Sequence, residues 1–172
     1  MKKIAKRSAE DMMSLYVVFL RALYQIHQNN HWKAIDYGHH LLFERLYNLV
    51  KDLVDESAEK TIGLFGNLSK QDKVSSIAAQ FSPDKFKDNE AVSCLLSSLS
   101  AEKAFQKYAT HVYNTLKDSN MTLGLDDMIM SHVNKSELHT YLLQQALKGL
   151  GVEPNEKKPE EPEEDEEEKD DE

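Results

Sequence analysis

Two histidines and three carboxylates in the first third of the chain could together bind a metal ion. They are His31, His40, Glu44, Asp55 and Glu59. Imidazole combined with carboxylate suits first-row metals such as iron, manganese or zinc, whereas oxygen ligands alone would favour magnesium or calcium. His40 with Glu44, and Asp55 with Glu59, are spaced four residues apart, so within a helix each pair lies on adjacent turns of one face. The sequence therefore predicts two half-sites for a transition metal.

The two half-sites cannot share one ion within a single chain. Around a helix, positions 40, 44, 55 and 59 fall at about 0°, 40°, 60° and 100°, on one side. Glu44 and Asp55, however, are separated by about 16 Å along the helix axis. If a second copy of the helix lies antiparallel across a two-fold axis, each His40/Glu44 pair faces the Asp55/Glu59 pair of the other copy. A C2 dimer would then complete two identical sites.

A purely structural interpretation of the same residues stays open. The same arc carries Asn48, Lys51 and Asp52, so it could be an ordinary solvated helix face. His31 continues an apolar stripe that runs through His27, and it could be a packed or capping histidine. Periodicity alone does not decide between the two interpretations.

Four long amphipathic helices are predicted to position these residues. Apolar residues follow a 3,4 spacing over about 8–30, 38–64, 89–117 and 125–150. The polar segment 66–88 joins the second helix to the third, with a short helix expected at 76–81, before Ser82-Pro83. The sequence thus predicts an all-α fold, a ferritin-like four-helix bundle with a short helix in the crossover between helices 2 and 3.

The net charge of −9 is unevenly distributed along the 172 residues. The last 22 residues, 151–172, hold 13 acidic and 3 basic residues, which leaves 1–150 with a net charge of +1. Beyond Val152 this tail has no aliphatic or aromatic side chain and is predicted to be disordered. The expected segments are a basic N-terminal arm at 1–7, the bundle domain at 8–151 and the disordered acidic tail at 152–172.

Several classes of protein are excluded by composition. No window approaches the roughly 18 uninterrupted apolar residues of a membrane span, and no convincing signal peptide is present. The single cysteine, Cys94, excludes an intrachain disulfide and a multi-cysteine zinc site. We therefore expect a cytoplasmic protein with no membrane partner.

The ligand pattern resembles the signature of the DNA-protection-during-starvation (Dps) branch of the ferritin-like superfamily. The matching motifs are His31-Trp32, His40-x-x-x-Glu44 and Asp55-x-x-x-Glu59-Lys60. A weaker similarity at 137–143 extends the resemblance to the end of the fourth helix. The segment after Trp32 is shorter than in the family, and Glu44 stands where aspartate is commoner.

This resemblance implies a ferroxidase with a dinuclear iron site between two subunits. The implied iron ligands are His31, His40 and Glu44 of one subunit with Asp55 and Glu59 of its neighbour, and Trp32 is the implied aromatic residue beside the site. The resemblance further implies hydrogen peroxide, more than dioxygen, as the oxidant. It also implies C2 dimers that assemble into a hollow dodecamer, in which oxidised iron is stored and peroxide damage is limited.

DNA binding is expected to be weak or absent. Residues 1–7 carry four positive charges and resemble the arm with which some Dps proteins contact phosphates, but the favoured interpretation is a basic start that folds into the first helix. The acidic tail would repel phosphate or compete with it for the arm.

Other functions stay open at this stage. The chain could be a ferritin-like structural or assembly protein without iron chemistry, or an interaction module that acts through its acidic tail. A ferritin centre within one subunit is disfavoured because the chain has no Glu-x-x-His motifs. His111 and His132 are expected to be core-edge or surface histidines rather than ligands.

Overall fold

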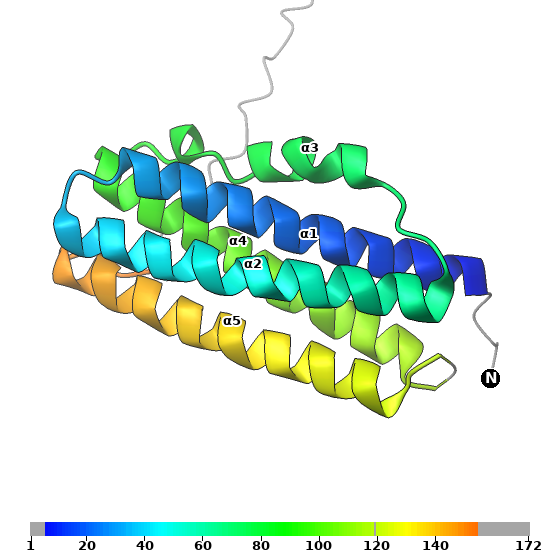
Figure 1. The fold of residues 1–172 in the computed structure, drawn as a ribbon. Coiled ribbons are helices and arrows are strands. Elements are labelled where there is room, and N and C mark those ends of the chain that lie inside the picture. The colour runs from blue at the N-terminus through cyan, green and yellow to red at the C-terminus, as the bar shows by residue number, and fades with distance from the viewer. Residues whose placement is uncertain (1–5, 119, 155–172) are drawn as a thin grey trace, which may run out of the picture.

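A computed structural model of the chain describes residues 6–118 and 120–154, and all regular structure within these residues is helical (Figure 1). The four long helices are α1 (Lys6–Lys33), α2 (Tyr37–Phe65), α4 (Glu90–Leu116) and α5 (Leu123–Gly149). Each lies within three residues of its predicted bounds. The predicted all-α bundle is confirmed.

Three of these helices begin at a residue whose side chain caps the first turn. Asp36 accepts a hydrogen bond from the His39 amide at 3.0 Å, and Asn89 and Thr122 cap α4 and α5 in the same way. Such caps satisfy amides that have no partner inside the helix. At the other end of α2, Gly66 adopts a φ of 93°, which favours glycine because it has no Cβ. Local sequence therefore sets where α2 begins and ends.

The crossover between α2 and α4 runs along the outside of α1 (Figure 1). It contains two single turns of 3₁₀ helix, η1 (Gln71–Lys73) and η2 (Pro83–Lys85), and the short helix α3 (Val74–Ala79) between them. The helix α3 starts two residues earlier than predicted because η1 leads directly into it. It also ends two residues earlier than predicted, at Ala79, so that Gln80 and Phe81 separate it from Ser82-Pro83.

Two apolar clusters form the core of the bundle, and a layer of polar side chains lies between them along the helices. One cluster includes Leu23 and Ile26 of α1 with Phe105 of α4, and the other includes Leu95 of α4 with Leu143 of α5. The buried polar residues that fall between these positions are His27, Asn30, Ser97, Ser98, Glu102, Ser136 and His139. A buried polar layer is unusual enough to require an explanation.

The predicted terminal segments are described only in part. Lys6 and Arg7, expected in the basic arm, are the first residues of α1. Residues 1–5 and 155–172, which hold the rest of that arm and most of the predicted tail, lie outside the described residues. No helix in the described part of the chain has a stretch long and apolar enough to cross a membrane.

Candidate metal centres

The turn from α1 into α2 brings His31 and His40 into direct contact. His31 lies in the last turn of α1 and His40 in the first turn of α2, nine residues apart across the short connection. Their ring centroids are 3.8 Å apart, and the Tyr47 ring packs edge-on against His31 with centroids 5.2 Å apart. Both imidazoles are half-buried. Two of the predicted ligands therefore lie together within one chain.

Hydrogen bonds determine which nitrogen of each imidazole is free. His31 Nδ1 lies 3.0 Å from the backbone oxygen of His40, and His40 Nδ1 lies 3.2 Å from the backbone oxygen of His31. A carbonyl oxygen only accepts hydrogen bonds, so each Nδ1 carries the proton and donates. In the neutral imidazole this leaves the Nε2 lone pair available for a metal, the usual arrangement for a ligating histidine.

The three predicted carboxylates lie along α2. Glu44 is half-buried one turn beyond His40, whereas Asp55 and Glu59 are exposed further along the same helix. Within one chain Asp55 and Glu59 are separated from the two histidines, as the helix rise predicts. Trp32 is 69% exposed and lines a surface pocket with Phe81 of the crossover.

His39 and His40 are neighbours in sequence but have different surroundings. His39 Nδ1 lies 3.7 Å from the carboxylate of Asp36, which caps α2. Only His40 packs against His31. This difference makes His39 a matched control for His40.

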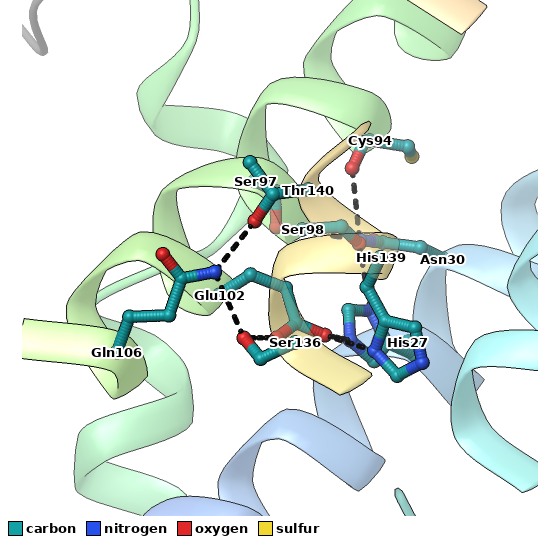
Figure 2. Close-up of polar contacts among 10 residues, drawn as sticks. All are labelled: His27, Asn30, Cys94, Ser97, Ser98, Glu102, Gln106, Ser136, His139 and Thr140. Atoms are coloured by element: carbon teal, nitrogen blue, oxygen red, sulfur yellow. Dashed lines mark hydrogen bonds and ion pairs between the residues drawn. The ribbon is translucent and has the colours of Figure 1, made fainter. Parts of the chain in front are cut away.

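A second group of possible ligands lies inside the bundle, where the sequence did not predict one. His27 of α1, Glu102 of α4 and His139 of α5 point toward one another (Figure 2). All three residues are 0–1% exposed. Among the residues that the structure describes, they are the one group of three histidine, cysteine or carboxylate side chains whose ligand atoms all lie within 4.8 Å of one another. Three separate helices thus converge on one carboxylate.

Hydrogen bonds connect this buried triad, His27, Glu102 and His139, to a wider polar network. His27 Nε2 and His139 Nδ1 each lie 2.8 Å from the same oxygen, Glu102 Oε1. Ser136 donates its hydroxyl to the other carboxylate oxygen, and Ser98 Oγ lies 3.0 Å from His27 Nδ1 (Figure 2). Every described contact to the Glu102 carboxylate therefore comes from a group that can donate a hydrogen bond.

The Glu102 carboxyl is ionised despite complete burial. Burial raises its pKa, but hydrogen bonds from His139 and His27, together with their positive charge when protonated, more than offset this effect. The pKa is lowered to about 2. The bundle interior therefore holds a carboxylate at neutral pH, which accepts hydrogen bonds from Ser136 and from the two imidazoles.

The sequence pattern does not predict the triad, for identifiable reasons. His27 falls on the apolar stripe of α1, which is typical of a core residue, and His139 has the wrong spacing from Glu137 for a metal-binding pair. Glu102 lies among small and apolar residues of α4. A carboxylate on a buried helix face requires a partner, so the position of Glu102 is the feature of the sequence that could have indicated the triad.

Two other histidines have surroundings unlike those of the candidate ligands. His111 is exposed. His132 is buried, with Nδ1 3.2 Å from the Tyr16 hydroxyl and Nε2 3.2 Å from Glu56 Oε2. Both ring nitrogens of His132 therefore have protein partners.

Comparison with known proteins supports the fold. No protein-family profile and no curated protein sequence matches the chain. The structure is similar to that of a mutant of Dps1 from Mycobacterium smegmatis, with a TM-score of 0.67 and 15% sequence identity. The match covers 83% of this chain and 96% of that chain. At this identity the similarity concerns the fold alone, so the chain is a divergent protein with a Dps-like, ferritin-like bundle fold.

Proposed function

We propose that the protein is a Dps-like mini-ferritin that binds and oxidises Fe²⁺ at dinuclear sites shared between two copies of the chain, and so stores or detoxifies iron. The observation that carries the proposal is the contact between His31 and His40. Each ring is held by a hydrogen bond through Nδ1, which leaves the lone pair of Nε2 available to bind a metal ion. Two adjacent imidazoles with this hydrogen bonding are suited to hold iron.

The exposed side of α2 supplies the missing carboxylates only if a second copy is present. Asp55 and Glu59 are exposed, and a helix placed antiparallel across a two-fold axis would carry them to the histidines of the partner. Large apolar side chains near the α1–α2 turn support such an interface. They are Trp32, Ile35, Tyr37 and Leu41, which are 43–93% exposed. We infer a homo-oligomer built from C2 dimers, with a dodecamer as the expected assembly.

The proposed reaction takes iron as its substrate. Two Fe²⁺ ions give up one electron each, the O–O bond of hydrogen peroxide breaks, and two protons complete two water molecules, leaving two Fe³⁺ ions. Asp55 and Glu59 would neutralise part of the iron charge, while His31 and His40 would leave open positions for the oxidant. The protein contributes placement and charge to chemistry that belongs to iron.

Substitution of the shared ligands tests this proposal. The variants His40→Ala and Glu59→Ala should each slow Fe²⁺ oxidation by hydrogen peroxide by at least about tenfold, the scale of effects seen around metal sites. Oxidation is followed by the absorbance of ferric iron in anaerobic stopped flow. The matched control His39→Ala should oxidise iron at the parent rate, because His39 faces Asp36 rather than His31.

The size of the particle is measured on the same samples by light scattering after size exclusion. Both ligand variants should keep the mass of the parent, since the substituted residues contact iron rather than hold the bundle together. Unchanged oxidation in both variants would show that the site is misassigned. A monomeric parent that binds no iron would favour a structural protein or an interaction module instead.

A further inference from the structure

The buried triad of His27, Glu102 and His139 has the composition of a transition-metal site. Two imidazoles and one carboxylate form the ligand set found at mononuclear iron and catalytic zinc sites. Here they come from α1, α4 and α5. The helix α2, which carries four of the five proposed shared ligands, contributes none of them, and His31 of α1 is not part of the group whose ligand atoms lie within 4.8 Å of one another. The triad is therefore a separate centre from the half-site formed by His31 and His40.

The distances in the triad fit one ion after a small adjustment. Metal–ligand bonds of about 2.0–2.1 Å place two ligands of one ion roughly 3–4 Å apart. The triad atoms lie within 4.8 Å of one another, with both imidazole contacts to Glu102 Oε1 at 2.8 Å. Insertion of an ion requires these contacts to open by only about half an ångström.

Two buried polar atoms in this network have no hydrogen-bond partner among the described residues. They are His139 Nε2 and Asn30 Oδ1. The Asn30 side chain is itself fully buried and donates through Nδ2 to Ser98 Oγ at 2.8 Å, and Ser98 in turn contacts His27 (Figure 2). Buried atoms without partners are uncommon and mark places where a ligand or water completes the network.

Metal binding would need only a shift of protons within each imidazole. The proton on the nitrogen that faces Glu102 moves to the other ring nitrogen, which frees a lone pair for the ion. For His27 the other nitrogen, Nδ1, already lies beside Ser98 Oγ, which can accept that proton in a hydrogen bond. For His139 the other nitrogen is Nε2, the atom without a partner. The ligand orientation is thus already supported for His27, whereas the Nε2 proton of His139 would need a water molecule as its acceptor.

The polar network around the triad reaches the wall of a surface pocket of about 420 Å³ between α1 and the crossover. Asn30 and Ser97 line this pocket. Asn30 Nδ2 contacts both Ser97 and Ser98, so one layer of polar side chains separates the pocket from His27. A cation entering here would meet hydroxyl and amide oxygens before the carboxylate.

We propose that His27, Glu102 and His139 form an intrabundle site that binds a single divalent first-row transition ion within one chain. The site requires no second copy of the protein. Its negative charge is provided by Glu102, its other two ligands by the imidazoles, and its outer hydrogen bonds by Ser98 and Ser136. Any further ligand would come from water or solute.

Cobalt provides a direct probe, because bound Co²⁺ has visible absorption that reports a site of low coordination number. The experiment starts from a full-length chain carrying His40→Ala and Glu59→Ala, which removes the proposed shared site. Equilibrium dialysis of this protein should give a single Co²⁺ ion per chain with that absorption. The ion should also raise the thermal unfolding temperature.

Substitutions in the triad then test the ligands in the same background. Glu102→Gln and His139→Gln should each weaken Co²⁺ binding by more than about 100-fold, beyond the effect of losing an outer hydrogen bond. His132→Gln is the control, since His132 is also buried in α5 but contacts Tyr16 and Glu56. It should leave the cobalt spectrum and stoichiometry unchanged.

Two results would overturn the proposal. One is the absence of bound Co²⁺ in the protein that carries only His40→Ala and Glu59→Ala. This measurement uses no triad variant, so it stays decisive even if the triad variants fold poorly. The other is an unchanged cobalt spectrum in folded Glu102→Gln, with folding checked by circular dichroism. Neither result depends on iron oxidation at the shared site, so the two proposals fail separately.

Discussion

At the scale of single residues, the histidines differ in which ring nitrogens already have partners. His31 and His40 each keep Nε2 free at a half-buried position. His27 and His139 direct a nitrogen at an ionised carboxylate. His132 has both nitrogens engaged, one with a tyrosine hydroxyl and one with Glu56. The same side chain is thus available for metal in one place and purely structural in another.

The pH dependence of stability should show the structural role of His132. Burial lowers the pKa of His132, with Lys135 adding to the effect and Glu56 opposing it. Because the folded-state pKa lies below the unfolded value of 6.5, the stabilisation is fully present above about pH 6.5 and is lost as the pH falls toward the folded-state pKa. The parent should therefore lose more unfolding free energy than His132→Gln between about pH 7.5 and pH 5.5.

Urea unfolding at a series of pH values measures this difference. Other titrating groups are common to both proteins, so they largely cancel in the comparison. Glu102 titrates in a separate and more acidic window, since its pKa is lowered to about 2. Parallel stability curves for the two proteins across the neutral window would show that His132 does not have a lowered pKa.

At the scale of the elements, two glycines near the end of α2 should respond in opposite ways to replacement by alanine. Gly66 has a φ of 93°, where a side chain is strained, whereas Gly63 lies inside the helix and a Cβ added there would meet no atom within 4 Å. Gly66→Ala should lower the unfolding free energy by about 1–2 kcal/mol. Gly63→Ala should raise it by about 0.5–1 kcal/mol, because alanine has less freedom to lose on folding.

Urea unfolding of the two single variants and the parent provides the measurement. The substitution is chemically the same in both, and the sites are three residues apart, so a difference in sign reports the backbone conformation. Destabilisation of both variants by the same amount would contradict the assigned end of α2.

The helices could be predicted from the sequence because apolar spacing and capping residues are local properties. Asp36, Asn89 and Thr122 stand directly before the helices that they cap. The triad could not be predicted in this way. His27 and Glu102 are 75 residues apart and Glu102 and His139 are 37 apart, so their meeting depends on the register of three packed helices.

The shared site has the opposite limitation. The contact between His31 and His40 follows from a short turn, and the spacing of the carboxylates follows from helix rise. In the proposed arrangement the carboxylates that complete the site come from a second copy of the chain, so the fold of one chain does not bring them to the histidines.

At the scale of the whole molecule, the charge divides the chain into a nearly neutral part and a strongly acidic tail. The last 20 residues, 153–172, carry all of the tail's net charge of −10, and the remaining 152 residues have a net charge of +1. Electrostatic attraction to phosphates acts through the net field and the local basic residues together. The full-length protein should consequently bind DNA weakly or not at all.

Deletion of residues 153–172 should increase DNA retention, because it changes the net charge from −9 to +1 and removes the competitor of the basic N-terminus. Gel shifts of the full-length and shortened proteins at low salt measure the change, and the added retention should disappear as salt rises. Substitution of Lys2 and Lys3 by alanine in the shortened chain should abolish it, because these lysines carry half of the positive charge of residues 1–7. If the shortened protein retains no more DNA than the full-length protein, the tail does not mask the N-terminus and its role must be sought in solubility or in a basic partner.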